Sequence, residues 1–129
     1  MRRILSVFIL ACTLLMWPSI IFAAEPKVIT AQDLFKAVTN DLEAARSLYL
    51  YETIHVSGIV VSKGISRYLT PNVVLSDRAG GSEMIICVLP RLDAAKLSDF
   101  QPGQSVTFTG RVQAMSQRVV MKECKVYTP

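Results

Sequence analysis

The sequence has few of the residues that build metal sites and catalytic centres. It contains one histidine and three cysteines, and no two cysteines have the Cys-x-x-Cys spacing. A zinc site needs several Cys or His ligands close together, so we expect no metal and no other cofactor. The chain also lacks a Gly-x-Ser-x-Gly motif, a phosphate-binding loop and a zinc-protease motif, and its carboxylates are scattered. These absences predict a protein that is not an enzyme.

Charged and aromatic residues are scarce as well. Charged residues make up 19% of the chain and aromatic residues 8%, whereas hydrophobic residues make up 51%. A disordered chain has the opposite composition, so we expect a folded protein. The length of 129 residues allows one domain with a targeting segment and excludes a multi-domain enzyme or a repeat array.

The first two dozen residues have the pattern of an export signal. Two arginines precede an uncharged stretch that runs from Ile4 to Ala24 and ends in small residues. A basic start, a short apolar run and small residues near its end are typical of a secretory signal peptide. We therefore predict that residues 1–23 are a signal peptide, cleaved after Ala23, and that the protein is periplasmic or secreted.

Two alternatives remain open for this segment. The uncharged residues 4–24 are long enough to cross a bilayer, so an uncleaved segment would anchor the protein to the inner membrane. Contact with a membrane is expected only in that case. Ile9–Cys12 is similar to a lipobox, but apolar residues continue beyond Cys12, where a lipid-bearing cysteine is followed by a polar tether. Pro18 interrupts the apolar run and favours cleavage.

Two cysteines, Cys87 and Cys124, remain after removal of residues 1–23. Loss of two arginines with that segment lowers the formal net charge from +4 to +2, which is too weak by itself to indicate a polyanion partner. A pair of cysteines in an exported domain favours a disulfide between them. The alternative is two buried thiols that pack as small hydrophobic groups.

The apolar pattern of residues 30–49 predicts one amphipathic helix. Thr30 is a suitable N-cap residue, and Asp33 suits the positively charged first turn. Apolar side chains then recur at steps of three and four residues as far as Tyr49. A helix with one apolar stripe has to cover another element, so we expect it to lie on the sheet that follows.

From Glu52 onward the pattern is that of short strands and turns. The predicted strands are 53–63, 72–76, 83–89, 106–114 and 118–127, with a short helix over 92–100. Gly58 and Gly110 fall inside two longer strands, where a glycine is typical of a bulge or a sharp bend. Five strands with an insertion between the third and the fourth are the layout of an OB-fold barrel. We predict a mainly β domain over residues 28–127, an OB-fold barrel preceded by one amphipathic helix.

Motifs of one known family recur along this domain. They are Ile29–Phe35, Asn40, Ala45, Tyr49, Val56–Val60, Val74–Asp77, Cys87, Pro102–Gly110 and Val120–Val126. With them the chain resembles the tRNA_anti-like family of bacterial OB-fold lipoproteins over about residues 28–127. The resemblance implies a helix-capped OB barrel in the cell envelope and a nucleic-acid ancestry in the family name alone. One departure is Cys12, which lies inside the apolar run and not at its end.

The expected ligand site lies on two loops of the barrel. OB barrels bind oligonucleotides and oligosaccharides through strands two and three and the loops after strands one and four. The residues of those loops and their borders that suit an anionic oligomer or a small anionic ligand are Lys63, Arg67, Tyr68, Gln117 and Arg118. Nucleic acid is an expected partner by family resemblance only. Strands two and three offer no aromatic ring between Val73 and Leu89 for base stacking, and the predicted compartment contains little nucleic acid.

The alternative function is docking or assembly with another envelope protein. Val74, Met84 and Ile86 would form an apolar outer patch if Val73, Leu75, Ile85 and Cys87 face inward. Strand alternation alone leaves open which of the two sets is buried. His55 alternates with Ile54 and Val56, so we expect it to be an outward surface residue without a catalytic role.

Overall fold

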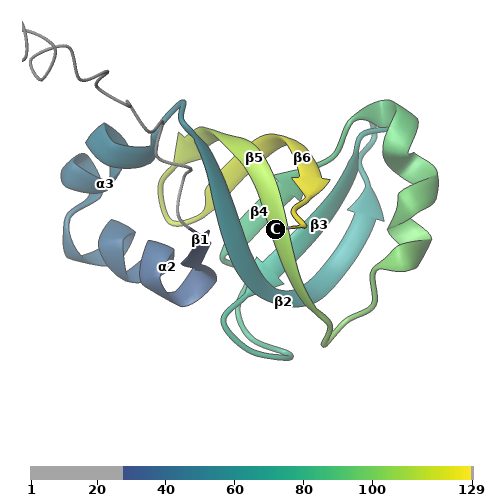
Figure 1. Cartoon of the computed structure of the whole chain (residues 1–129), viewed down its shortest axis with the longest axis horizontal. Helices are drawn as coiled ribbons and strands as arrows, with labels where there is room; N and C mark the ends of the chain where they lie inside the picture. Colours follow the sequence, from purple (N-terminus) through teal and green to yellow (C-terminus); the bar gives the residue numbers. More distant parts are fainter. Residues whose placement is uncertain (1–27, 129) are drawn as a thin grey trace, which may run out of the picture.

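The computed structural model describes residues 28–128, and the predicted signal peptide lies outside these residues. The elements are β1 (Val28–Thr30), α2 (Ala31–Asn40), α3 (Leu42–Tyr49), β2 (Thr53–Ile65), β3 (Pro71–Ser76), β4 (Ile85–Val88), the 3-10 helix η1 (Arg91–Asp99), β5 (Ser105–Met115) and β6 (Val119–Val126). The strand order is β1-β2-β3-β4-β6-β5. A further pairing of β2 with β5 closes the five strands β2 to β6 into a barrel, and β1 is an additional strand that pairs with β2 in parallel. Helices α2 and α3 lie at one end of the barrel and η1 at the other (Figure 1).

The single helix expected over residues 30–49 is divided in two. Asp41 ends α2 with an extended backbone (φ −157°, ψ 95°), and its side chain accepts a hydrogen bond from the Ala44 N–H at 3.1 Å. Aspartate is a favourable N-cap because its carboxylate satisfies free amide groups of the first turn. The prediction of one continuous helix is therefore wrong. The predicted cap at the start of α2 is confirmed, since Thr30 Oγ1 accepts from the Asp33 N–H.

Strand β2 closes the barrel because it pairs with two neighbours in succession. Its first part pairs with β5 over Thr53–Ile59, and its later part pairs with β3 over Ile59–Ile65. The register shifts between Val60 and Ser62, and a bulge of this kind increases the local twist and bends the strand. The bulge expected near Gly58 thus lies a few residues further along the same strand.

Gly110 marks a second bend, in β5. The pairing of β5 with β6 shifts register between Thr109 and Arg111, as its glycine predicted. A Cβ atom at Gly110 would lie 2.8 Å from Cys124 Sγ and 3.1 Å from the backbone oxygen of Lys122. The backbones of β5 and β6 therefore approach each other here more closely than a residue with a β-carbon would allow.

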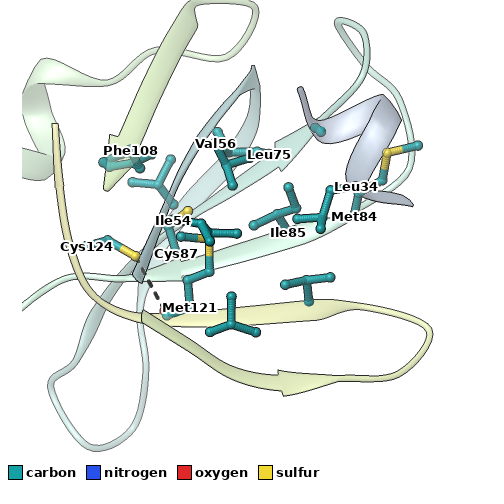
Figure 2. Close-up of a cluster of buried hydrophobic side chains, with 14 of the residues drawn as sticks. Leu34, Ile54, Val56, Leu75, Met84, Ile85, Cys87, Phe108, Met121 and Cys124 are labelled. Carbon is teal, nitrogen blue, oxygen red and sulfur yellow. Dashed lines mark hydrogen bonds between the residues drawn. The ribbon is translucent and has the colours of Figure 1, made fainter. Parts of the chain in front are cut away.

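The core fills the barrel and extends under α2. Figure 2 shows inward-pointing side chains from the strands, with Leu34 of α2 packing at one side of the cluster. Phe108, fully buried on β5, lies with its ring centroid 5.3 Å from that of Phe100, which follows η1. Phe100 and the neighbouring Leu97 bring η1 onto the end of the barrel. Burial of these large side chains is the main stabilising term of the fold.

Candidate ligand-binding site

The loop between β2 and β3 has a fixed shape that depends on Ser66. The Ser66 N–H donates to the Thr70 carbonyl at 3.0 Å, and the Leu69 N–H donates to the Ser66 carbonyl at 2.9 Å. Ser66 Oγ also accepts from the Tyr68 and Thr70 N–H groups, each at 3.3 Å. Leu69 adopts a left-handed backbone (φ 60°), which is unfavourable for a residue with a β-carbon. The loop is therefore held in one conformation.

Two of the predicted site residues lie together on this loop. Arg67 and Tyr68 are both exposed, and Arg67 forms no ion pair with any residue in 28–128. Lys63, at the end of β2, donates from Nζ to the Leu97 carbonyl of η1 at 2.8 Å. This hydrogen bond ties the end of β2 to η1.

The other two predicted residues lie on the turn between β5 and β6. Arg118 forms an ion pair with Glu83, in which its Nη1 atom is 3.1 Å from Oε2. Both side chains are largely exposed, so the pair adds little to stability and is open to competition by another anion. Gln117 lines an apolar groove of about 260 Å³ with residues of α2 and α3, among them Phe35 and Leu42.

The structure separates these two groups instead of joining them in one patch. Asn72, next to the β2–β3 loop, pairs with Val88 at the end of β4, whereas Leu75 pairs with Ile85 at its start. Ile85 in turn pairs with Val119, directly after the β5–β6 turn. The two loops thus lie at opposite ends of β4, about 10 Å apart along the strand at 3.3 Å per residue. Arg67 and Arg118 therefore belong to loops at opposite ends of β4.

The outer sheet face between the loops is aliphatic. Val74 pairs with Ile86, and Ile86 pairs with Val120, so these three residues form a row across β3, β4 and β6. Val74 is buried, and the other two are partly buried. Met84 does not belong to this face, because it packs in the core together with Ile85. The expectation that Met84 contributes to an outer patch is wrong.

Of the two alternating sets on β3 and β4, the set of Val73, Leu75, Ile85 and Cys87 is entirely in the core. Val73, Leu75, Ile85 and Cys87 each have at most 1% of their surface exposed. The alternation left open by the sequence is thereby settled for β3 and β4.

A hollow that the sequence did not suggest lies between η1 and β6. It has a volume of about 520 Å³ and an apolar floor that includes Phe100, with Lys96 and Lys125 at its sides. Lys96 forms an ion pair with Asp93 at 3.6 Å. The hollow joins segments about thirty residues apart, so no local motif could have indicated it.

His55 has the expected direction but not the expected exposure. Its neighbours Ile54 and Val56 point into the core, and His55 points out of the barrel. Tyr127 covers it with a stacked ring (centroids 3.9 Å apart, 15° between planes), which leaves 8% of the histidine exposed. The ring also hydrogen bonds from or to Thr109, with Nδ1 2.6 Å from Oγ1. The prediction of an exposed surface residue is wrong, because a side chain 72 residues away covers it.

Cys87 and Cys124 are buried free thiols in the structure. Cys124 Sγ is 3.5 Å from the Met121 carbonyl, to which it donates (dashed line in Figure 2). A hydrogen bond with Cys124, reinforced by burial, raises the pKa of the Cys87 thiol well above its ordinary value of 9.0. The two thiols are therefore neighbours inside the barrel, and the disulfide between them stays a prediction.

Residues 28–128 contain neither a cluster of metal ligands nor a helix that could span a membrane. No three His, Cys, Asp or Glu side chains of that range are grouped so that they could hold a metal ion. Among the same residues, no helix is long and apolar enough to cross a membrane.

The closed five-stranded barrel, with a helix between β4 and β5, defines an OB-fold domain. The chain belongs to the tRNA_anti-like family, whose model matches residues 7–126. None of the curated proteins matches the chain.

Solved structures confirm the fold. A protein from Klebsiella pneumoniae, described as a candidate nucleic acid-binding lipoprotein, superimposes with a TM-score of 0.67 at 18% identity, over 87% of this chain and 100% of that one. An OBody bound to hen egg-white lysozyme matches with a TM-score of 0.52 at 15% identity, over 82% and 98% of the two chains. RecG bound to a three-way DNA junction gives 0.51 at 18% identity, over 80% of this chain and 13% of that one.

Proposed function

We propose that this chain is a non-catalytic binding protein of the cell envelope, periplasmic or secreted, that takes an anionic ligand at the β2–β3 loop. The observation that carries the proposal is the loop itself, in which the hydrogen bonds of Ser66 hold Arg67 and Tyr68 in solvent. A guanidinium group is well suited to phosphate, sulfate or carboxylate. A neighbouring tyrosine ring adds flat apolar surface at low entropic cost.

Because Arg67 and Arg118 lie at opposite ends of β4, a small ligand and a long ligand would contact different residues. A small anion at the β2–β3 loop would be within reach of Arg67 and of the ammonium group of Lys63. An extended oligomer would cross the outer face of β3 and β4 and also reach Arg118 and Gln117 at the other end. An oligonucleotide is the first oligomer to test, because the Klebsiella neighbour is described as nucleic acid-binding.

Catalysis is not part of this proposal. His55, the only histidine of the chain, contacts Thr109 through Nδ1 and is covered by Tyr127. A general base needs a ring nitrogen that its substrate can reach. The side chain of His55 is only 8% exposed, so we do not assign it this role.

The test is fluorescence anisotropy with a labelled single-stranded oligonucleotide and with a labelled sulfated oligosaccharide. Arg67→Ala should weaken binding about tenfold and reduce the dependence of log K on log salt by about one phosphate contact. Arg78→Ala is the matched control, because it removes one exposed positive charge from the β3–β4 turn at the other end of the barrel. Equal losses in the two variants would contradict a site at Arg67. If neither these probes nor an anionic lipid surface binds in an Arg67-dependent way, the proposed function is wrong.

A second function is favoured by the aliphatic row of Val74, Ile86 and Val120. A sheet face without charged residues in its centre is typical of protein interfaces more than of anion sites. Ile86→Lys would then abolish association with an envelope protein and leave the binding of anions unchanged. Cross-linking in the envelope with this variant separates the two functions, since Arg67→Ala predicts the reverse pattern.

A further inference from the structure

Large apolar side chains are exposed together at the end of the barrel that carries the β2–β3 loop. Ile65, Tyr68 and Leu69 have 55%, 71% and 72% of their surface exposed, and Leu92 in the first turn of η1 has 97%. The Leu89 N–H donates to the Pro71 carbonyl at 2.9 Å, which brings the start of η1 beside the end of the loop. Single exposed apolar residues are common on protein surfaces, but a group of four on adjoining segments indicates an interaction surface.

The loop keeps these side chains exposed although its backbone conformation is unfavourable. Leu69 has a positive φ of 60°, and the hydrogen bonds of Ser66 and Thr70 on either side of it fix that conformation. Without them, a leucine would avoid the left-handed region. The protein thus has an apolar tip at this end whose loop is held in one conformation, next to the hollow between η1 and β6 that Leu92 also lines.

Two arginines lie beside the apolar tip. Arg67 lies between the exposed residues of the loop, and Arg91 precedes Leu92 at the start of η1; both are exposed. Neither arginine forms an ion pair with another residue in 28–128. The nearby Asp93 is matched by Lys96. The acidic Glu83 and Asp77 belong to the β3–β4 turn at the opposite end.

We propose that this end of the barrel inserts its apolar tip into the interface of an anionic lipid bilayer, with Arg67 and Arg91 on the headgroup phosphates. The inference rests on the proposed function, because it names lipid headgroups as the anionic ligand of the same loop. Protruding leucine and isoleucine side chains gain nothing from a nucleic-acid backbone, whereas a bilayer is fluid and accommodates a convex apolar surface. Tyrosine is enriched at this depth because its ring is apolar and its hydroxyl is polar.

The test uses two tryptophan variants of the full chain. Trp17 is the only tryptophan and lies in the predicted signal peptide, so it contributes equally to both variants. Leu69→Trp places a reporter on the loop, and Leu48→Trp places one on α3, where the leucine is similarly exposed (66%). Each variant is mixed with vesicles of phosphatidylcholine and phosphatidylglycerol whose acyl chains are brominated, because bromine quenches only tryptophan that enters the apolar layer.

The expected result is a blue shift and a loss of roughly half of the emission for Leu69→Trp, and no change for Leu48→Trp. Arg67→Ala in the Leu69→Trp background should shift half-saturation to several-fold more lipid, and the effect should diminish at high salt. Circular dichroism of each variant shows that it is folded. Membrane tethering by residues 4–24 would act on both variants equally, so it cannot account for a difference in quenching between them.

Three results would overturn the inference. Equal quenching of the two variants would place the contact elsewhere, and equal binding to pure phosphatidylcholine would remove the need for an anionic surface. A response of Leu69→Trp to the oligonucleotide but not to vesicles would assign the loop to nucleic acid. In that last case, or if the sulfated oligosaccharide binds in an Arg67-dependent way without any vesicle binding, the proposed function stands and only the bilayer inference fails.

Discussion

Replacement of Gly110 by alanine tests whether the barrel is closed as tightly as the structure indicates. The new Cβ atom would lie 2.8 Å from Cys124 Sγ and 3.1 Å from the Lys122 carbonyl oxygen. Favourable contacts of this kind need about 3.5–4.0 Å, so β5 and β6 would have to separate by roughly 1 Å. Cys124 is fully buried and the carbonyl belongs to the backbone, so neither can turn away into solvent.

The magnitude follows from two opposing terms. Overpacking of a core contact costs about 1–3 kcal/mol. Alanine also restricts the unfolded chain relative to glycine, which offsets about 0.4–1 kcal/mol of that cost. We therefore expect Gly110→Ala to lower the free energy of unfolding by about 1–2 kcal/mol.

Gly64→Ala is the matched control for this experiment. Gly64 also lies in a strand, but a Cβ atom there has no heavy atom within 4 Å. The same substitution should therefore be neutral or stabilise the protein by up to about 1 kcal/mol. Both values come from urea denaturation followed by far-UV circular dichroism, with equal m-values for the three proteins. If Gly110→Ala were as stable as Gly64→Ala, the close approach of β5 and β6 would be refuted.

Four further predictions concern His55, the two cysteines and Glu83. His55→Ala should lower the free energy of unfolding by about 1–3 kcal/mol, since it removes the ring stack with Tyr127 and a partner of Thr109; urea denaturation measures it, and a value near zero would contradict it. In the reduced protein the pKa of Cys87 is raised in the folded state, so its contribution is complete below pH 9.0 and is lost as the pH rises further. The free energy of unfolding of the reduced wild type, relative to that of Cys87→Ala, should thus stay constant below pH 9.0 and decrease above it. Titration of the denatured, unreduced protein with a thiol reagent should find no free Cys87 or Cys124 if the proposed disulfide forms, and two reactive thiols would reject it. Glu83→Gln should strengthen binding of a long anionic oligomer by freeing Arg118 and leave a small anion unaffected, as measured by anisotropy.

Much of the fold could be predicted because strand patterns are local. The alternation around Phe108 in β5 and the glycine at its bend gave the strand and its bulge correctly. The break at Asp41 was missed, because the apolar steps of three and four residues continue across it while its capping role depends on backbone geometry. The burial of His55 was missed because it comes from the stacked ring of Tyr127, distant in the sequence.

The sequence placed the candidate residues on their loops but did not show how the two loops lie relative to one another. Lys63, Arg67 and Tyr68 do lie at one end of the barrel, as their common loop and its border require. The sequence could not show that Arg118 lies at the other end, because its position depends on the parallel pairing of β4 with β6. Nor could it reveal the left-handed backbone of Leu69 in the loop. Both properties arise from contacts between segments and not from the local pattern.

Chemical-shift mapping by NMR tests most directly whether the β2–β3 loop is the binding surface of this barrel. The ¹⁵N-labelled protein is titrated with the oligonucleotide, the sulfated oligosaccharide and small bicelles that contain phosphatidylglycerol. We predict that the largest amide shifts fall on Ser66, Arg67, Tyr68 and Leu69 for at least one of the three. Shifts centred instead on Val74, Ile86 and Val120, or no shifts with any of the three, would contradict the account.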